Sequence, residues 1–146
     1  VIKGTGDNAT GAVSFFNSTG RIENCLFIDN GWTALNCKEG SNPVFTNNTV
    51  VGNQYAIECN TGSSPEIINT IIWTNSNAFY VNGESHPRIS YSIIQGSGLV
   101  EDMKDAGNNI FGVDPEFTDP STGDYSIKSN SPALKKGEGG ENIGAL

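Results

Sequence analysis

The sequence predicts an all-β solenoid, in which short strands stack coil upon coil. Three observations predict this class. Pro43, Pro65 and Pro87 recur every 22 residues, apolar residues form columns with the same spacing, and asparagines recur at fixed places between those columns. A unit of this length cannot bury its apolar residues alone, so neighbouring units must stack to form a core.

Each repeat is expected to contain three short strands separated by turns. Within the last strand, alternation of apolar and polar residues predicts two inward columns and one outward column. The first interval is 23 residues because one extra residue lies between Asn30 and Ala34, around Trp32. The inward columns are Ile22/Phe45/Ile67/Ile89, Phe27/Val50/Ile72/Ile94, Val13/Leu35/Ile57/Phe79 and Phe15/Cys37/Cys59/Val81.

Asparagines are predicted to hold the corners between strands. Asn24, Asn47 and Asn69 each follow the first apolar column by two residues, and a buried amide requires hydrogen-bond partners. We therefore expect their side chains to form a ladder from coil to coil. Asn48 is expected to take the tight-turn conformation that asparagine tolerates.

The repeat, Ile-x-Asn-x-x-[Phe/Val/Ile]-x-x-Asn followed by [Gly/Ala]-apolar-x-apolar, resembles the right-handed parallel β-helix of pectate-lyase-like proteins of the secreted bacterial type. The resemblance covers roughly residues 1–100. It implies about five coils of ~22 residues across residues 1–113. Residues 97–110 break the register and are interpreted as a loop excursion. Leucine-rich repeats are excluded because their Leu-x-x-Leu-x-Leu consensus is absent.

Residues 114–146 are similar to the closing segment of such proteins. They contain Asp114-Pro-Glu-Phe117, Gly123-Asp-Tyr125 and Ser131-Pro-Ala133. The resemblance implies an irregular cap at the C-terminal end of the coils, and an extracellular location, secreted or on the cell surface. Because the chain starts at Val1 rather than Met, we expect a mature product or an excised fragment.

Composition narrows the classes of partner. A net charge of -8 with only eight Lys and Arg residues argues against nucleic acid, whose binding depends on basic side chains. No apolar run approaches the ~20 residues of a membrane span. The expected partners are a polysaccharide or other copies of the chain, in a homo-oligomer or filament.

The resemblance raises the question of catalysis, because related solenoids include polysaccharide lyases and hydrolases. The hydrolase strings Asp-Asp, Gly-His-Gly and Arg-Ile-Lys are absent, and residues 1–100 hold only four basic residues. No catalytic residue is assigned, and a structural or adhesive module is predicted. The alternative is the C-terminal part of a polysaccharide lyase or glycoside hydrolase.

Candidate binding residues lie on two outward faces. Asn36, Glu58 and Tyr80 share the outward column of the last strand, which is either a ligand face or an ordinary solvated one. Trp73 belongs to an apolar patch outside the Phe27 column. Such a patch marks an interface or a ligand surface, unless the loop at 97–110 or the tail folds over it.

No cofactor is expected, and Ca²⁺ is the one ion considered. Carboxylates that could hold it are Glu101, Asp102 and Asp105, or Asp119 with Asp124; turns explain them equally well. The lone His86 is expected at a turn. Cys37 and Cys59 are expected to stack as free thiols, although a disulfide is possible in distance. Sequons at Asn8, Asn17 and Asn47 weakly support glycosylation.

Overall fold

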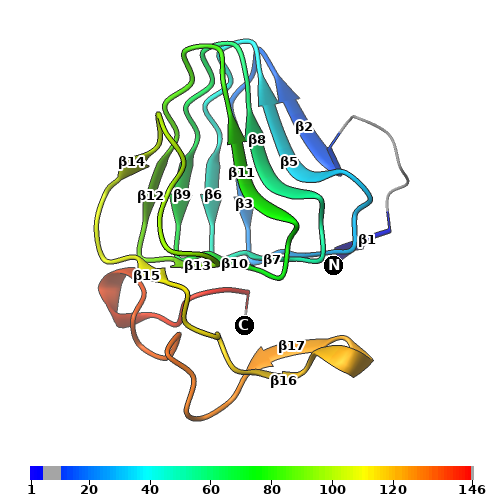
Figure 1. Cartoon of the computed structure of the whole chain (residues 1–146), viewed down its shortest axis with the longest axis vertical. Helices are drawn as coiled ribbons and strands as arrows, with labels where there is room; N and C mark the ends of the chain where they lie inside the picture. Colours follow the sequence, from blue (N-terminus) through cyan, green and yellow to red (C-terminus); the bar gives the residue numbers. More distant parts are fainter. Residues whose placement is uncertain (5–10, 146) are drawn as a thin grey trace.

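A computed structural model describes residues 1–4 and 11–145, so the sequon at Asn8 lies outside the described residues. Three parallel sheets form a solenoid with a three-sided cross-section (Figure 1). Sheet A has the order β1 (Ile2–Lys3), β4 (Leu26–Ile28), β7 (Thr49–Val51), β10 (Ile71–Trp73), β13 (Ile93–Ile94), β15 (Ile110–Phe111). Sheet B has the order β2 (Val13–Phe16), β5 (Thr33–Lys38), β8 (Tyr55–Cys59), β11 (Asn77–Val81). Sheet C has the order β3 (Arg21–Glu23), β6 (Val44–Thr46), β9 (Glu66–Ile68), β12 (Arg88–Ser90), β14 (Lys104–Asp105).

The predicted inward columns form the core of the solenoid. Phe27 pairs in register with Val50, and Leu35 with Ile57, as the 22- and 23-residue spacings require. Their side chains are fully buried in a single cluster that runs through the coils. The all-β parallel solenoid predicted from the repeat is therefore confirmed, with about four turns rather than about five.

Residues 97–110 contain a shortened coil, so their interpretation as a simple loop excursion is wrong. β14 pairs with β12 through Ile89 and Asp105, and β15 pairs with β13 through Ile93 and Ile110. The paired residues are 16 and 17 positions apart in the sequence, fewer than the 22 of a full repeat. This coil therefore lacks the residues that would form a strand in sheet B. Instead, Leu99 and Met103 pack against the end of the core and cover it.

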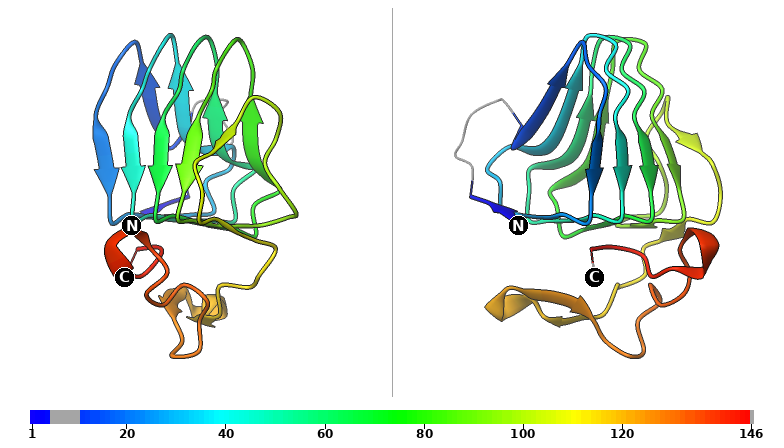
Figure 2. Two further views of the ribbon diagram at one scale, coloured as in Figure 1. Left: turned by 90° about the vertical axis from the view of Figure 1, so that its left-hand side faces the viewer. Right: turned by 180° about the vertical axis from the view of Figure 1, so that it is seen from behind.

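The tail lies along the outer face of sheet A rather than across the end of the solenoid (Figures 1 and 2). It contains β16 (Phe117–Asp119), the short helix η1 (Pro120–Thr122), β17 (Asp124–Ile127) and η2 (Glu138–Gly140). Its apolar residues form a second buried cluster with the outward residues of sheet A. The predicted end cap is thus misplaced, and the tail covers the apolar patch. The cluster comprises Ile28, Val51, Ile71, Ile93, Phe117, Ala133 and Ile143.

Backbone N–H groups at the end of the tail donate hydrogen bonds to β7 and to the turn before β10. The N–H of Glu138 donates to Asn69 Oδ1 at 2.6 Å, and the N–H of Gly144 donates to the Asn69 carbonyl at 2.7 Å. The N–H of Ala145 donates to Thr49 Oγ1 at 3.0 Å. A side chain at Gly144 would lie 2.7 Å from Ile71 Cδ1, so glycine permits this close approach.

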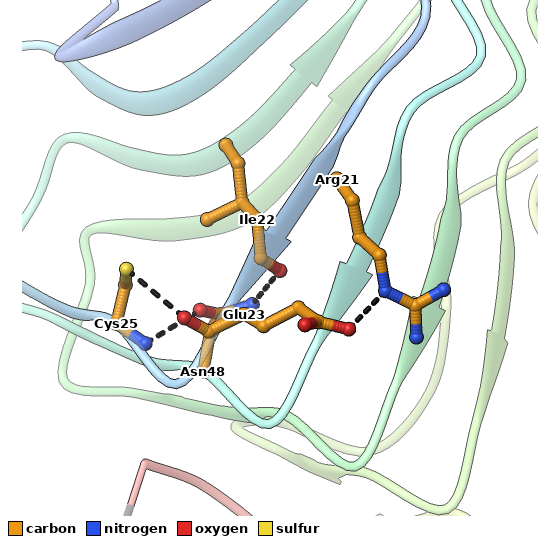
Figure 3. A network of polar contacts seen from close by, with 5 residues as sticks. All are labelled: Arg21, Ile22, Glu23, Cys25 and Asn48. Carbon is orange, nitrogen blue, oxygen red and sulfur yellow. Dashed lines mark hydrogen bonds and ion pairs between the residues drawn. The ribbon is translucent and has the colours of Figure 1, made fainter.

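The asparagine ladder predicted for Asn24, Asn47 and Asn69 is wrong. All three adopt the left-handed conformation, with φ of 54°, 52° and 50°, and no hydrogen bond joins their side chains within residues 11–145. Asn48 makes the ladder contact instead (Figure 3): its Oδ1 accepts from the Cys25 N–H at 2.9 Å and its Nδ2 donates to the Ile22 carbonyl at 3.0 Å. The positive φ falls at Asn47 and not at Asn48 as predicted. Asn47 therefore forms the tight turn, and Asn48 makes the contact between coils.

Two further polar ladders hold the other corners. Asn53 Oδ1 accepts from the Asn30 N–H, and Asn75 Oδ1 accepts from the Asn53 N–H, both at 3.0 Å. At the corner between sheets B and C, the N–H of Ser41 donates to Ser63 Oγ and the N–H of Ser63 to Ser85 Oγ. Backbone N–H groups in the turns have no partner within a sheet. Side chains of the next coil accept their hydrogen bonds instead.

Candidate functional site

The outer face of sheet B carries a groove of about 550 Å³, here called the aromatic groove. One set of its lining residues is aromatic: Trp32 precedes β5, Tyr55 begins β8 and Tyr80 lies on β11. The other set is polar, and most of it comes from the opposite ends of the same strands and the turns that follow. The polar residues are Lys38, Glu39, Glu58, Asn60, Thr61 and Asn82.

The three rings form a row across successive coils. The ring centroids of Trp32 and Tyr55 are 5.6 Å apart with planes at 62°, and those of Tyr55 and Tyr80 are 5.6 Å apart at 64°. Edge-to-face packing of this kind is favourable and holds each ring in place. Trp32 and Tyr80 remain 38% and 42% exposed, so the row keeps apolar surface available to a ligand.

The extra residue of the second coil explains the position of Trp32. Thr33 pairs in register with Tyr55, and the Tyr55 N–H donates to the Trp32 carbonyl at 2.9 Å. The added residue therefore lies at the corner before β5, and Trp32 packs beside Tyr55. The insertion at Gly31 and Trp32 was visible in the repeat count, and it is the sequence signal that could have located this groove.

Glu58 is the central polar group of the groove. Its Oε2 accepts from Thr33 Oγ1 at 3.1 Å, and its Oε1 accepts from Asn60 Nδ2 at 2.7 Å. Within the described residues the ion pairs are Arg21–Glu23 and Lys128–Glu116, so neither Glu58 nor Lys38 has an ionic partner there. Asn82 Nδ2 donates to Tyr80 Oη at 3.0 Å, which orients the phenol at the groove surface.

The predicted site residues separate into three places. Glu58 and Tyr80 line the aromatic groove. Asn36 is in register with Glu58 as expected, but it is only 2% exposed. Gly11 lies over it, since a side chain at Gly11 would lie 2.9 Å from Asn36 Cβ, and Asn36 Oδ1 lacks a hydrogen-bond partner among the described residues. Asn36 is therefore removed from the set of ligand contacts.

Trp73 lies on a different face, beside the tail. It lines a smaller groove of about 320 Å³ together with Phe117 and Tyr125, whose ring centroids are 5.2 Å apart at 84°. Lys128 and Glu116, 3.6 Å apart, stand at the same groove. Trp73 is half-buried against the second core, so the tail covers the patch around it, which is the second of the two alternatives that the sequence left open.

Three of the five acidic residues considered for Ca²⁺, Asp105, Asp119 and Asp124, make turn contacts. Hydrogen bonds from Ser121 and Ser126 lower the pKa values of Asp119 and Asp124 respectively. Asp105 Oδ1 accepts from the Gly107 N–H and from Asn109 Nδ2. Across residues 1–4 and 11–145, no group of three or more His, Cys, Asp or Glu side chains is arranged to hold a metal ion.

The lone histidine and the three cysteines lie outside the aromatic groove. His86 is exposed, with Nδ1 3.4 Å from the Asp102 carbonyl. Cys25, Cys37 and Cys59 are free thiols in the described structure. A hydrogen bond with Cys37 and burial raise the pKa of the Cys59 thiol well above its ordinary value. No helix of the described chain is long and apolar enough to cross a membrane.

Comparison with known proteins supports the fold directly. Neither a search of curated proteins nor a search of solved structures finds a match to this chain. A family model described as the right-handed β-helix region matches residues 3–134. Apart from Ile2, that span includes all three parallel sheets, and it covers most of the tail. The chain therefore belongs to the right-handed β-helix family.

Proposed function

We propose that this structural β-helix module binds polysaccharide in the aromatic groove, in an extracellular and adhesive role. The observation that carries the proposal is the row of Trp32, Tyr55 and Tyr80 beside a row of amide, hydroxyl and carboxylate groups. Ligand pockets of about 300–1,000 Å³ that combine apolar surface with a few fixed polar groups are typical of specific binding.

The chemistry of a sugar chain fits both rows. A pyranose ring presents C–H groups on its faces, which pack on aromatic side chains and release water. Its hydroxyl groups at the ring edge both donate and accept hydrogen bonds. Asn60, Thr61 and Asn82 offer donors and acceptors, and the Glu58 carboxylate keeps lone pairs beyond the two that Thr33 and Asn60 use.

Successive coils each contribute one ring to a row that runs obliquely across sheet B, because Tyr80 is in register with Glu58 and not with Tyr55. Stacked strands repeat at about 4.8 Å, and the two centroid separations of 5.6 Å are close to that repeat. An extended polymer that follows this oblique row can therefore contact one ring per coil. A polymer suits this arrangement better than a single sugar, because each coil adds contacts of the same kind.

Titration calorimetry with a set of soluble polysaccharides tests the proposal. Trp32→Ala and Tyr80→Ala should each weaken binding at least about tenfold, the loss of roughly 1.4 kcal/mol of contact. Trp73→Phe, at the tail groove, serves as the matched control and should bind as the unaltered chain does. Equal affinity of all four proteins would refute the groove as the site. Chain length of the polymers after incubation tests the alternative of a lyase or hydrolase.

Self-association through the N-terminal coil is a second candidate. Among the described strands, β2 and β3 stand at the end of sheets B and C, and Phe16 on β2 is 68% exposed. Val13, Phe15 and Ile22 are only partly buried, and edge strands with apolar residues favour pairing with another chain. Sedimentation velocity should show oligomers that Phe16→Glu dissociates; a monomer at all concentrations contradicts this candidate.

A further inference from the structure

We infer, resting on the proposed function, that the aromatic groove selects neutral polysaccharides, and that Glu58 is the residue that excludes uronate-rich, polyanionic chains. The structural basis is the balance of charge in the groove. Two carboxylates, Glu39 and Glu58, line it against one ammonium group, Lys38. The whole chain has a net charge of -8, so the surrounding field also opposes a polyanion.

The position of the Glu58 charge is fixed. Thr33, 1% exposed, and Asn60 hold one carboxylate oxygen each. The carboxylate therefore cannot swing away when a second negative group approaches. The two donors are neutral, so they hold the carboxylate in place without cancelling its charge.

Hydrogen-bond chemistry gives the same preference. An ionised carboxylate only accepts hydrogen bonds. A sugar hydroxyl donates to it in a charge-assisted bond, which is stronger than a neutral one. A uronate carboxylate has no proton to donate and meets Glu58 as a like charge, a juxtaposition that is strongly unfavourable when desolvated. Specificity here would arise from repulsion of the wrong ligand as well as from contacts with the right one.

Lys38 is the feature that argues for the opposite preference, because it could pair with a uronate. It is half-buried at the end of β5 on a long flexible side chain, and an ion pair of such a side chain at the protein surface contributes little to affinity. The two glutamates outnumber it, and one of them is held rigidly. Lys38→Met therefore separates the two possibilities without changing the aromatic row.

The experiment measures the affinity of the whole chain for a soluble neutral β-glucan and for polygalacturonate. Glu58→Gln keeps the shape of the side chain and removes its charge. We expect it to raise the affinity for polygalacturonate about tenfold relative to the β-glucan. Glu66→Gln, on the exposed face of sheet C, is the matched control and should leave the ratio unchanged. Glu39→Gln gives a second removal of groove charge, with a smaller expected change in the same direction.

Salt provides an independent readout on the unaltered protein. Raising ionic strength from about 0.01 M to about 1 M shortens the Debye length from about 30 Å to about 3 Å. The discrimination against polygalacturonate should therefore shrink as salt rises, while the affinity for the β-glucan changes little.

The outcomes separate the two proposals. Tighter binding of polygalacturonate than of β-glucan, abolished by Lys38→Met, would overturn neutral selectivity and leave polysaccharide binding intact. An affinity ratio that is the same for Glu58→Gln and Glu66→Gln would overturn the role of Glu58. Absence of binding to every polysaccharide tested would overturn the proposed function itself, and this inference with it.

Discussion

Asn75→Ala should be among the most destabilising single changes at the corners of the solenoid. Asn75 is 6% exposed, and its side chain makes four hydrogen bonds. Its Oδ1 accepts from the backbone N–H and the Nδ2 of Asn53 at 3.0 and 2.8 Å. Its Nδ2 donates to the carbonyls of Val50 and Trp73 at 2.9 and 3.1 Å.

The magnitude follows from what each partner loses. The Asn53 N–H is left buried without an acceptor, which costs about 1–3 kcal/mol, and each of the other bonds contributes about 0.5–1.5 kcal/mol net. Asn53 Nδ2 keeps the Val51 carbonyl at 2.9 Å, and the Trp73 carbonyl keeps Thr74 Oγ1 at 2.7 Å. These remaining contacts reduce the expected loss to about 3–4 kcal/mol.

Urea unfolding followed by far-ultraviolet circular dichroism measures this loss. The midpoint should fall by roughly 1–2 M at an unchanged slope. Asn77→Ala is the control, because Asn77 is exposed and its side chain makes one long contact, 3.5 Å to the Gln54 carbonyl. If the two variants unfold within about 0.5 kcal/mol of each other, the ladder does not stabilise the corners and the reasoning fails.

Four other predictions address the turns, the tail and the thiols. Asn47→Gly should change the free energy of unfolding by less than about 0.5 kcal/mol, whereas Asn47→Val should lower it by more than about 1 kcal/mol. The reason is that φ of Asn47 is 52°, where glycine is unstrained and β-branched residues are strained. Equal losses for the two variants in urea unfolding would contradict a purely conformational role of Asn47. Gly144→Ala should loosen the tail and speed its cleavage in limited proteolysis, because the added methyl group would lie 2.7 Å from Ile71 Cδ1 and 2.9 Å from Thr49 Oγ1. An unchanged cleavage rate would contradict the close packing of the tail on sheet A. In the native protein only Cys25 should react readily with a thiol reagent, because Cys37 and Cys59 are 0% exposed. Folding raises the pKa of Cys59, so the folded state holds the thiol proton more tightly than the unfolded state, and the free energy of unfolding should fall as pH rises above about 8.5. Cys59→Ala should flatten this decline, measured as the urea midpoint at each pH. An identical pH profile for both proteins would refute the assignment to Cys59.

The repeat determined most of the fold in advance because its signal is redundant. Every inward column recurs at the same interval, so Phe27, Val50 and Ile72 identify one another even where a single coil is ambiguous. The corner residues were less predictable. Asn47 and Asn48 are adjacent and chemically identical, and only the backbone angle at Asn47 decides which side chain faces the preceding coil.

The site was predicted only in part because its residues come from different positions in the repeat. Glu58 and Tyr80 share an outward column, which alternation reveals. Trp32 lies at the corner before β5 and Tyr55 is the first residue of β8, and the contact of their rings depends on a one-residue insertion. The tail has no repeat at all, so its docking on Ile71 and Ile93 could be raised as a possibility but not decided.

The emission of Trp32 during a polysaccharide titration tests the account most directly. The chain has two tryptophans, so Trp73→Phe leaves Trp32 as the only one. We predict that a neutral β-glucan shifts its emission to shorter wavelength and saturates, as the 38% exposed indole becomes covered. In Trp32→Phe, the emission of Trp73 beside the tail should stay constant. A change at Trp73 with none at Trp32 would place the ligand elsewhere and contradict the aromatic groove as the binding site.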